Sequence, residues 1–112
     1  MAYDERLAQR IRQAVTGEAQ LTEKTLFGGL AFLIAGNMAI AASGQGGVLV
    51  RVDPDQADRL VATTPAFPME MRGRPMRGWL RVNAEDLRTK RQLQKWVDVA
   101  VSYARTLPPK TG

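Results

Sequence analysis

The sequence predicts a single α+β domain with two layers, in which a five-stranded antiparallel sheet carries helices on one face. Five short stretches alternate between apolar and polar residues or are continuously apolar, as strands are, and turn-forming residues separate them. Both ends of the chain and one central segment instead repeat apolar residues at helical spacing. The order helix, three strands, helix, two strands, helix favours antiparallel pairing with the helices on one side.

The first helix is predicted over residues 4–16, because Leu7, Ile11 and Val15 recur at helical spacing before Gly17. A strand that is apolar on both faces is predicted over residues 24–36. Because helices in this order cover only one face of the sheet, we expect a second copy of the chain to shield the other face.

Gly36 and Asn37 predict a tight turn with positive φ, leading into a second strand over residues 38–43. The Gly-Gln-Gly-Gly sequence at residues 44–47 predicts the next turn. Strict alternation then predicts a third strand over residues 48–52, which completes a three-stranded meander.

The second helix is predicted to begin after Asp53, a typical N-cap followed by proline, with Gln56 completing a capping box. It is expected to end before Pro65, because the residue before a proline is forced out of helical geometry.

A strand over residues 67–71 is predicted to lie at the edge of the sheet, because Pro68 cannot donate a hydrogen bond to a neighbouring strand. Residues 73–78 are predicted to form an exposed connection, and residues 79–82 the fifth strand.

The final helix is predicted from a possible capping box of Thr89 and Gln92. Its apolar stripe, which Pro108 ends, is formed by Leu93, Trp96, Val97, Ala100, Val101, Ala104 and Leu107. Residues 108–112 are expected to form a frayed tail, and residues 1–112 a single domain.

The composition argues against the common enzyme classes. The 112 residues include no cysteine and no histidine, which removes disulfides, thiol nucleophiles, the commonest general base and the usual zinc ligands. We therefore expect a protein that is not an enzyme and has no cofactor and no metal. The polar amino terminus and the lack of a long apolar segment predict a cytoplasmic location without membrane association.

Positive charge is concentrated in one part of the chain. Residues 72–95 contain eight basic and two acidic side chains, whereas the formal net charge of the whole protein is +5. The first half of this segment supplies the candidate partner-binding residues. These are Arg72, Arg74, Met76, Arg77, Trp79 and Arg81.

Three interpretations of this basic segment remain open: a solvated loop, a protein contact and a nucleic-acid contact. Arginine binds carboxylates and phosphates with its planar guanidinium and is also enriched at protein interfaces, whereas no nucleic-acid-binding motif surrounds the segment. Arg88, Arg91 and Lys95 on the final helix are expected to form only a solvated face.

Other candidates for chemistry are weaker. The glycines at residues 28–29 and 44–47 match no phosphate-binding motif, and a glycine within a strand more often marks a bulge or a close backbone approach. Asp53 is explained as a helix cap. The methionines at 69, 71 and 76 are interpreted as residues that fill gaps in a core or an interface.

Several segments together resemble the TfoX N-terminal domain family, related to the TfoX/Sxy regulators of bacterial competence. They are MAYDERLAQRI, TEKTLFGGLAFLIAGNM, VLVRVDP, FPMEMRGRPMRGWLRV and LQKWVDVAVSYARTLPPK, and they cover nearly the whole chain. The resemblance implies an α+β fold similar to secretion-chaperone-like domains. It also implies a regulatory role in transcription through a protein partner, such as the cyclic-AMP receptor-type activator with which the longer competence regulators act.

Overall fold

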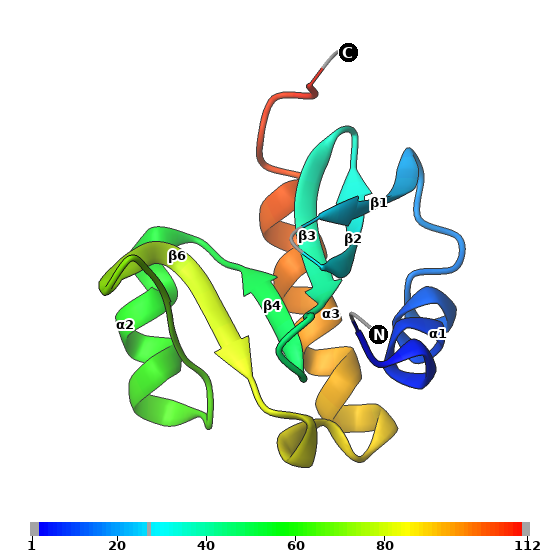
Figure 1. Cartoon of the computed structure of the whole chain (residues 1–112). Helices are drawn as coiled ribbons and strands as arrows, with labels where there is room; N and C mark the ends of the chain where they lie inside the picture. The colour runs from blue at the N-terminus through cyan, green and yellow to red at the C-terminus, as the bar shows by residue number, and fades with distance from the viewer. Residues whose placement is uncertain (1–2, 27, 111–112) are drawn as a thin grey trace.

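The computed structural model describes residues 3–26 and 28–110. Within them the chain forms an α+β fold of three α-helices and one antiparallel sheet (Figure 1). In chain order the elements are α1 (Glu5–Ala14), β1 (Leu21–Leu26), β2 (Gly29–Ile34), β3 (Asn37–Ala42), β4 (Val48–Arg51), α2 (Pro54–Thr63), β5 (Phe67–Met71), β6 (Arg74–Val82), the 3-10 helix η1 (Ala84–Leu87) and α3 (Lys90–Ala104).

The sheet has six strands in the order β1-β2-β3-β4-β6-β5, so the predicted number of five is wrong. The predicted strand over residues 24–36 is in fact a hairpin, in which Leu26 pairs with Gly29. Gly28 has a φ of +75°, a conformation that suits glycine and reverses the chain. At Gly29 the predicted close backbone approach is confirmed, because a Cβ atom there would lie 2.5 Å from the carbonyl oxygen of Ala42.

The predicted connection over residues 73–78 is also wrong, because β6 already begins at Arg74 and pairs with β5. The chain reverses at Arg72 and Gly73, which both have positive φ. A glycine-arginine-proline sequence resembles a turn, but here cross-strand pairing extends through the proline. The predicted edge position of β5 is confirmed.

Several local signals have the predicted effect. The Asp53 carboxylate accepts from the Asp55 N–H, and Thr89 and Gln92 form the capping box of α3. The capping box predicted for Gln56 is wrong, because the cap of α2 consists of the Asp53 side chain alone. The β2–β3 turn is centred one residue earlier than predicted, because Ala35 and Gly36 have positive φ.

Asn37 therefore begins β3 and is almost fully buried. Its side-chain amide donates to the Pro108 carbonyl oxygen at 2.9 Å. The Lys110 N–H donates to the Ala35 carbonyl oxygen at 2.8 Å. Helix α3 ends at Ala104 and not at Leu107 as predicted. The segment that follows the helix is attached to the β2–β3 turn by these two hydrogen bonds as far as Lys110.

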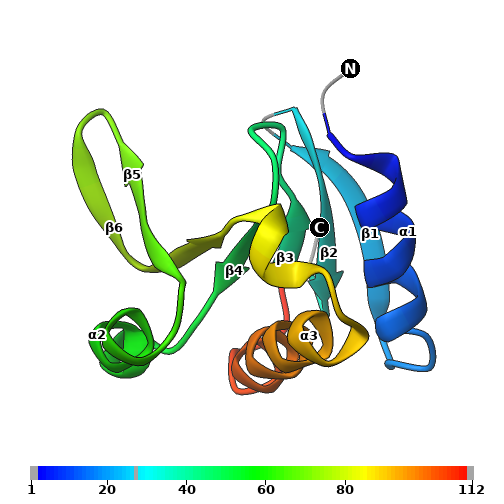
Figure 2. The same cartoon turned by 90° about the horizontal axis from the view of Figure 1, so that it is seen from below.

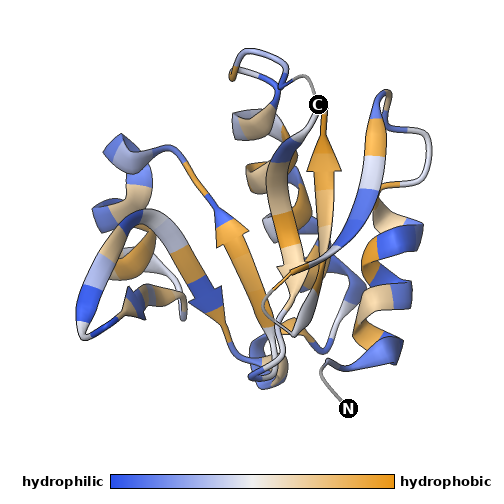
Figure 3. Cartoon of the chain, turned by 45° about the horizontal axis from the view of Figure 1, so that its top comes forward, coloured by the Kyte–Doolittle hydropathy of each residue, from blue (hydrophilic) through white to orange (hydrophobic). Residues whose placement is uncertain are grey.

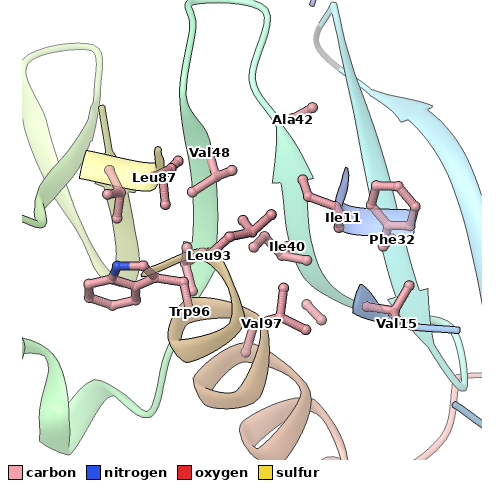
Figure 4. Packing of buried hydrophobic residues seen from close by; sticks show 14 of the residues in the cluster. Ile11, Val15, Phe32, Ile40, Ala42, Val48, Leu87, Leu93, Trp96 and Val97 are labelled. Carbon is pink, nitrogen blue, oxygen red and sulfur yellow. The ribbon is translucent and has the colours of Figure 1, made fainter. Parts of the chain in front are cut away.

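All three helices pack on one face of the sheet, as predicted. Figure 4 shows Leu93, Trp96 and Val97 of α3 beside Ile40 of β3 and Val48 of β4. Side chains of α1 (Leu7, Ile11 and Val15) and Ala57 of α2 join the same core. Figure 3 shows the central strands of the sheet as mainly hydrophobic, whereas hydrophilic and hydrophobic residues alternate along the helices.

The opposite face of the sheet carries no helix. Figure 2 shows the β5–β6 hairpin bending away from β1–β3 on the side opposite α3. Ala31 and Ala41, which pair with each other on the helix-free face, are 0% and 6% exposed in the single chain. The apolar character of this part of the face therefore does not by itself require a second copy.

Gly47→Ala is expected to destabilise the domain more than Gly46→Ala. Both glycines have positive φ, so each alanine adds backbone strain of about 1–2 kcal/mol. At Gly47 a Cβ atom would also lie 2.1 Å from the Val82 carbonyl oxygen, whereas at Gly46 nothing lies within 4 Å. Urea denaturation of the two variants measures the difference, and equal losses would contradict the described β4–β6 contact.

Glu23→Gln is expected to flatten the dependence of stability on pH in the acidic range. The hydrogen bond from the Arg12 guanidinium to Glu23, 2.7 Å long, lowers the pKa of the Glu23 carboxyl. A lowered folded-state pKa adds stability above the unfolded pKa of about 4.3, and this stability is lost as pH falls. Melting temperatures of wild type and variant should therefore differ at pH 7 and converge toward pH 3; a constant difference would contradict the assignment.

Candidate binding groove on the open face of the sheet

A groove of about 250 Å³ lies on the helix-free face, between the β5–β6 hairpin and the β1–β2 and β3–β4 turns. Its surface is mostly apolar. The residues that line it are Leu26, Gly29, Met38, Ala41, Ala42, Ser43, Gly44, Gln45, Leu49, Met69, Glu70, Met71, Met76, Trp79 and Arg81. They come from all six strands and from the β3–β4 turn, so the groove depends on the curvature of the whole sheet.

Methionine is concentrated in this groove. All four methionines in the described residues line it, namely Met38, Met69, Met71 and Met76. None of them belongs to the buried core, which consists of aliphatic and aromatic residues and alanine. Methionine side chains are flexible and polarizable and adapt to irregular apolar shapes. Their placement provides an apolar surface that can adjust to a bound molecule.

Local backbone geometry directs the hairpin residues into the groove. Side chains alternate along β5, which places Met69 and Met71 on the same side. The β5–β6 register shifts between Pro68 and Glu70, and Gly78 in the facing strand has a φ of +86°. This bulge bends the hairpin and brings Met76 to the same side.

Helix α2 supports the outer face of the hairpin. A Cβ atom at Gly78 would lie 3.1 Å from Cγ of Pro54, so the glycine allows the first residue of α2 to pack closely against β6. An ion pair between Arg77 of β6 and Asp55 of α2, with 3.3 Å between nitrogen and oxygen, joins the same two elements. Their side chains are 74% and 83% exposed, so this pair adds little stability.

Arg81 forms the polar end of the groove. Its guanidinium donates to the side-chain oxygen of Gln45 and to the carbonyl oxygen of Gly46, the latter at 3.2 Å. It also lies 5.8 Å from the ring centroid of Phe67. These contacts join the β3–β4 turn to the hairpin and hold the positive charge at a fixed position.

Trp79 contributes an aromatic wall. The guanidinium carbon of Arg51 lies 5.2 Å from the Trp79 ring centroid, and Arg51 and Trp79 are paired residues on β4 and β6. A cation over the ring restrains the indole while another part of its surface lines the groove.

The structure divides the predicted partner-binding residues into two sets. Met76, Trp79 and Arg81 line the groove together. Arg72 lies in the turn at the hairpin tip, and Arg74 and Arg77 are exposed and do not line the groove. The four arginines therefore do not form one surface, because alternation and the bulge send them in different directions.

Sequence reasoning missed the residues that reach the groove from other elements, especially Met38, Gln45 and Leu49. Only the pairing of β3, β4 and β6 brings them beside the hairpin. The alternation of Met69 and Met71 was the available signal, since it predicts that both lie on one face of an edge strand.

In the described residues, no group of three acidic side chains is arranged to hold a metal ion. None of the helices there is long and apolar enough to cross a membrane.

Arg81→Lys is expected to lower the free energy of unfolding by about 1 kcal/mol, because lysine keeps the charge but cannot reproduce the two contacts to Gln45 and Gly46. Arg74→Lys is the matched control, because Arg74 is exposed and forms no such contact. Denaturant unfolding measures both, and indistinguishable stabilities would show that Arg81 does not hold the groove together.

Comparison with known families matches residues 5–104 to the TfoX N-terminal domain. No match was found among curated proteins or among solved structures. The matched residues run from the start of α1 to the end of α3 and include every strand and the whole lining of the groove. The chain therefore belongs to the TfoX N-terminal domain family.

Proposed function

We propose that this TfoX N-terminal domain is a non-enzymatic regulatory domain that acts in the cytoplasm by binding another protein through the groove. One observation carries the proposal: every methionine in the described residues lines a single groove on the helix-free face of the sheet. Methionine-rich surfaces are typical of proteins that accept apolar segments of varying shape.

The chemistry of the lining indicates what kind of segment fits. Leu49, Met38 and the hairpin methionines offer apolar contacts, and Arg81 offers a positive charge at one end. Arginine has five N–H donors, and the contacts to Gln45 and Gly46 use two of them. The groove therefore favours a segment with bulky apolar side chains and a nearby carboxylate, which would pair with Arg81.

A segment of another protein fits the groove better than a second copy of this chain. A concave apolar surface needs a protruding apolar ligand. Met71, at 41%, is the single exposed large hydrophobic residue in the described part of the chain, and it already lines the groove. A second copy could therefore place only the tip of its own β5–β6 hairpin into the groove as an apolar ligand.

Two further observations support the rest of the proposal. The chain has neither cysteine nor histidine, which leaves few groups suited to nucleophilic or general-base catalysis. Membership of the TfoX N-terminal domain family supports a role in regulating transcription, with a transcription activator as the class of partner.

Selection from a displayed library of random peptides tests the proposal. Enriched peptides should combine bulky apolar residues with an acidic residue, and binding should quench or shift the fluorescence of a tryptophan that lines the groove, Trp79. The double variant Met69→Lys, Met76→Lys should weaken binding by about tenfold or more, because it places charges in an apolar site. Arg74→Gln, a change outside the groove, should leave the affinity unchanged.

Two results would overturn the proposal. One is a library that yields no peptide sensitive to the two methionine substitutions. The other is sedimentation of the pure chain as a dimer that the same substitutions dissociate, because the groove would then be occupied by a second copy.

A further inference from the structure

The helix face of the molecule carries a charged surface, separate from the mostly apolar groove. Five basic side chains gather where α1 meets the start of α3, and we call them the basic face. They are Arg10, Arg88, Lys90, Arg91 and Lys95. Two adjacent shallow depressions connect them: Arg10, Arg88 and Lys90 line one, and Lys90, Arg91 and Lys95 line the other.

Arg10 belongs to this surface although it lies far away in the sequence. Its guanidinium donates to the carbonyl oxygen of Leu87 at 2.7 Å and lies near those of Arg88 and Thr89. These contacts fix a positive charge from α1 beside the first turn of α3.

The charges of the basic face are not neutralised within the described residues. The ion pairs there involve Arg12, Arg77 and Arg105, and none involves the five basic residues. The one carboxylate lining the two depressions is Asp98, which accepts from the Gln94 side chain at 2.9 Å.

The positions of these charges are unfavourable for the free protein. Lys90 and Arg91 occupy the first turn of α3, which has no acidic residue, and cations at this end of a helix oppose its dipole. Arg91 and Lys95 are four residues apart on the helix, where like charges repel. Lys95 lies 5.6 Å from the ring centroid of Trp96, whereas no ion pair or cation–π contact compensates Lys90 or Arg91 within the described residues. Placements of cations without such compensation are expected mainly at functional sites.

The neighbours of the charges indicate the class of ligand. The other residues lining the two depressions are polar at Gln13, Gln94 and Asp98 and apolar at Ala14, Leu93 and Val99, but none of these three apolar residues is exposed. Met71, the exposed large hydrophobic residue of the described chain, lies on the hairpin and not on this face. A protein interface would need apolar anchors, and a membrane-binding helix would need an apolar face in contact with lipid.

We propose that the basic face binds the phosphodiester backbone of a nucleic-acid duplex. Lysine and arginine neutralise the phosphates, and the Gln13 side chain and the backbone amides of Lys90 and Arg91 supply further donors. Because contacts to phosphates carry no sequence information, we expect the binding to be independent of base sequence. This proposal does not depend on the groove, which lies on the opposite face of the sheet.

Fluorescence anisotropy with a labelled 20-base-pair DNA duplex at several salt concentrations tests the proposal. Wild-type affinity should fall steeply with salt, because each neutralised phosphate contributes about −0.9 to the slope of log K against log salt. The triple variant Lys90→Gln, Arg91→Gln, Lys95→Gln should bind more weakly, with a slope flatter by about 3. A shuffled duplex should bind equally well.

The hairpin provides a matched control, the triple variant Arg72→Gln, Arg74→Gln, Arg77→Gln. It also removes three positive charges, but from exposed arginines outside the basic face. Both triple variants therefore have the same formal net charge. It should keep the wild-type salt slope. Urea unfolding should show the α3 variant to be no less stable than wild type, because the removed cations oppose the dipole and repel each other.

Four results would overturn the proposal: no binding at low salt, equal losses in both triple variants, loss confined to the hairpin variant, or discrimination against the shuffled duplex. Vesicles containing 30% phosphatidylserine serve as a further probe. Binding to these vesicles without binding to the duplex would also overturn it, because the basic face would then recognise a lipid surface.

Discussion

The packing of α3 across β3 and β4 is the interaction on which the rest of the structure depends. Leu93, Trp96 and Val97 bury one side of the helix against Ile40 and Val48, and apolar burial of this kind is the main source of stability in a domain of this size. Both α1 and α3 contact β3, so the helices form one layer. The opposite face of the sheet is then left without a helix, and the groove occupies part of it.

A difference in strand length creates the groove. β4 has four residues and β6 has nine, so β4 pairs only with the Trp79–Val82 part of β6. The Gly78 carbonyl oxygen still accepts from the Val52 N–H at 2.8 Å, but the start of β6 before it pairs with β5 alone, and the strand bends at Gly78, which has positive φ. A two-stranded ribbon twists more strongly than a wide sheet, and this bend produces a concave surface.

Local signals in the sequence predict most of the fold. The caps at Asp53 and Thr89 and the edge position of the proline-containing strand follow from local chemistry, and the placement of the helices on one face follows from the order of the elements. The turn at Gly28 could not be predicted in this way, because an apolar run interrupted by glycine fits one long strand as well as a hairpin. The choice depends on pairing between β1 and β2, which local sequence does not encode.

The candidate site was predictable only where its residues are close in the sequence. Met76, Trp79 and Arg81 share one strand, in which Trp79 and Arg81 alternate and the bulge brings Met76 to the same side, whereas Met38 and Gln45 reach the groove through the sheet topology. Residue type alone does not reveal that Arg77 pairs with Asp55 while Arg81 turns toward Gln45, so the separation of the arginines could not be predicted from the sequence.

The division of sulfur between core and surface has a chemical consequence. The described core contains no methionine, while the groove contains four. Peroxide converts methionine to a polar sulfoxide, which reductases can reverse. Oxidative stress would therefore change the polarity of the groove, while the described core that holds the fold together contains no thioether to oxidise.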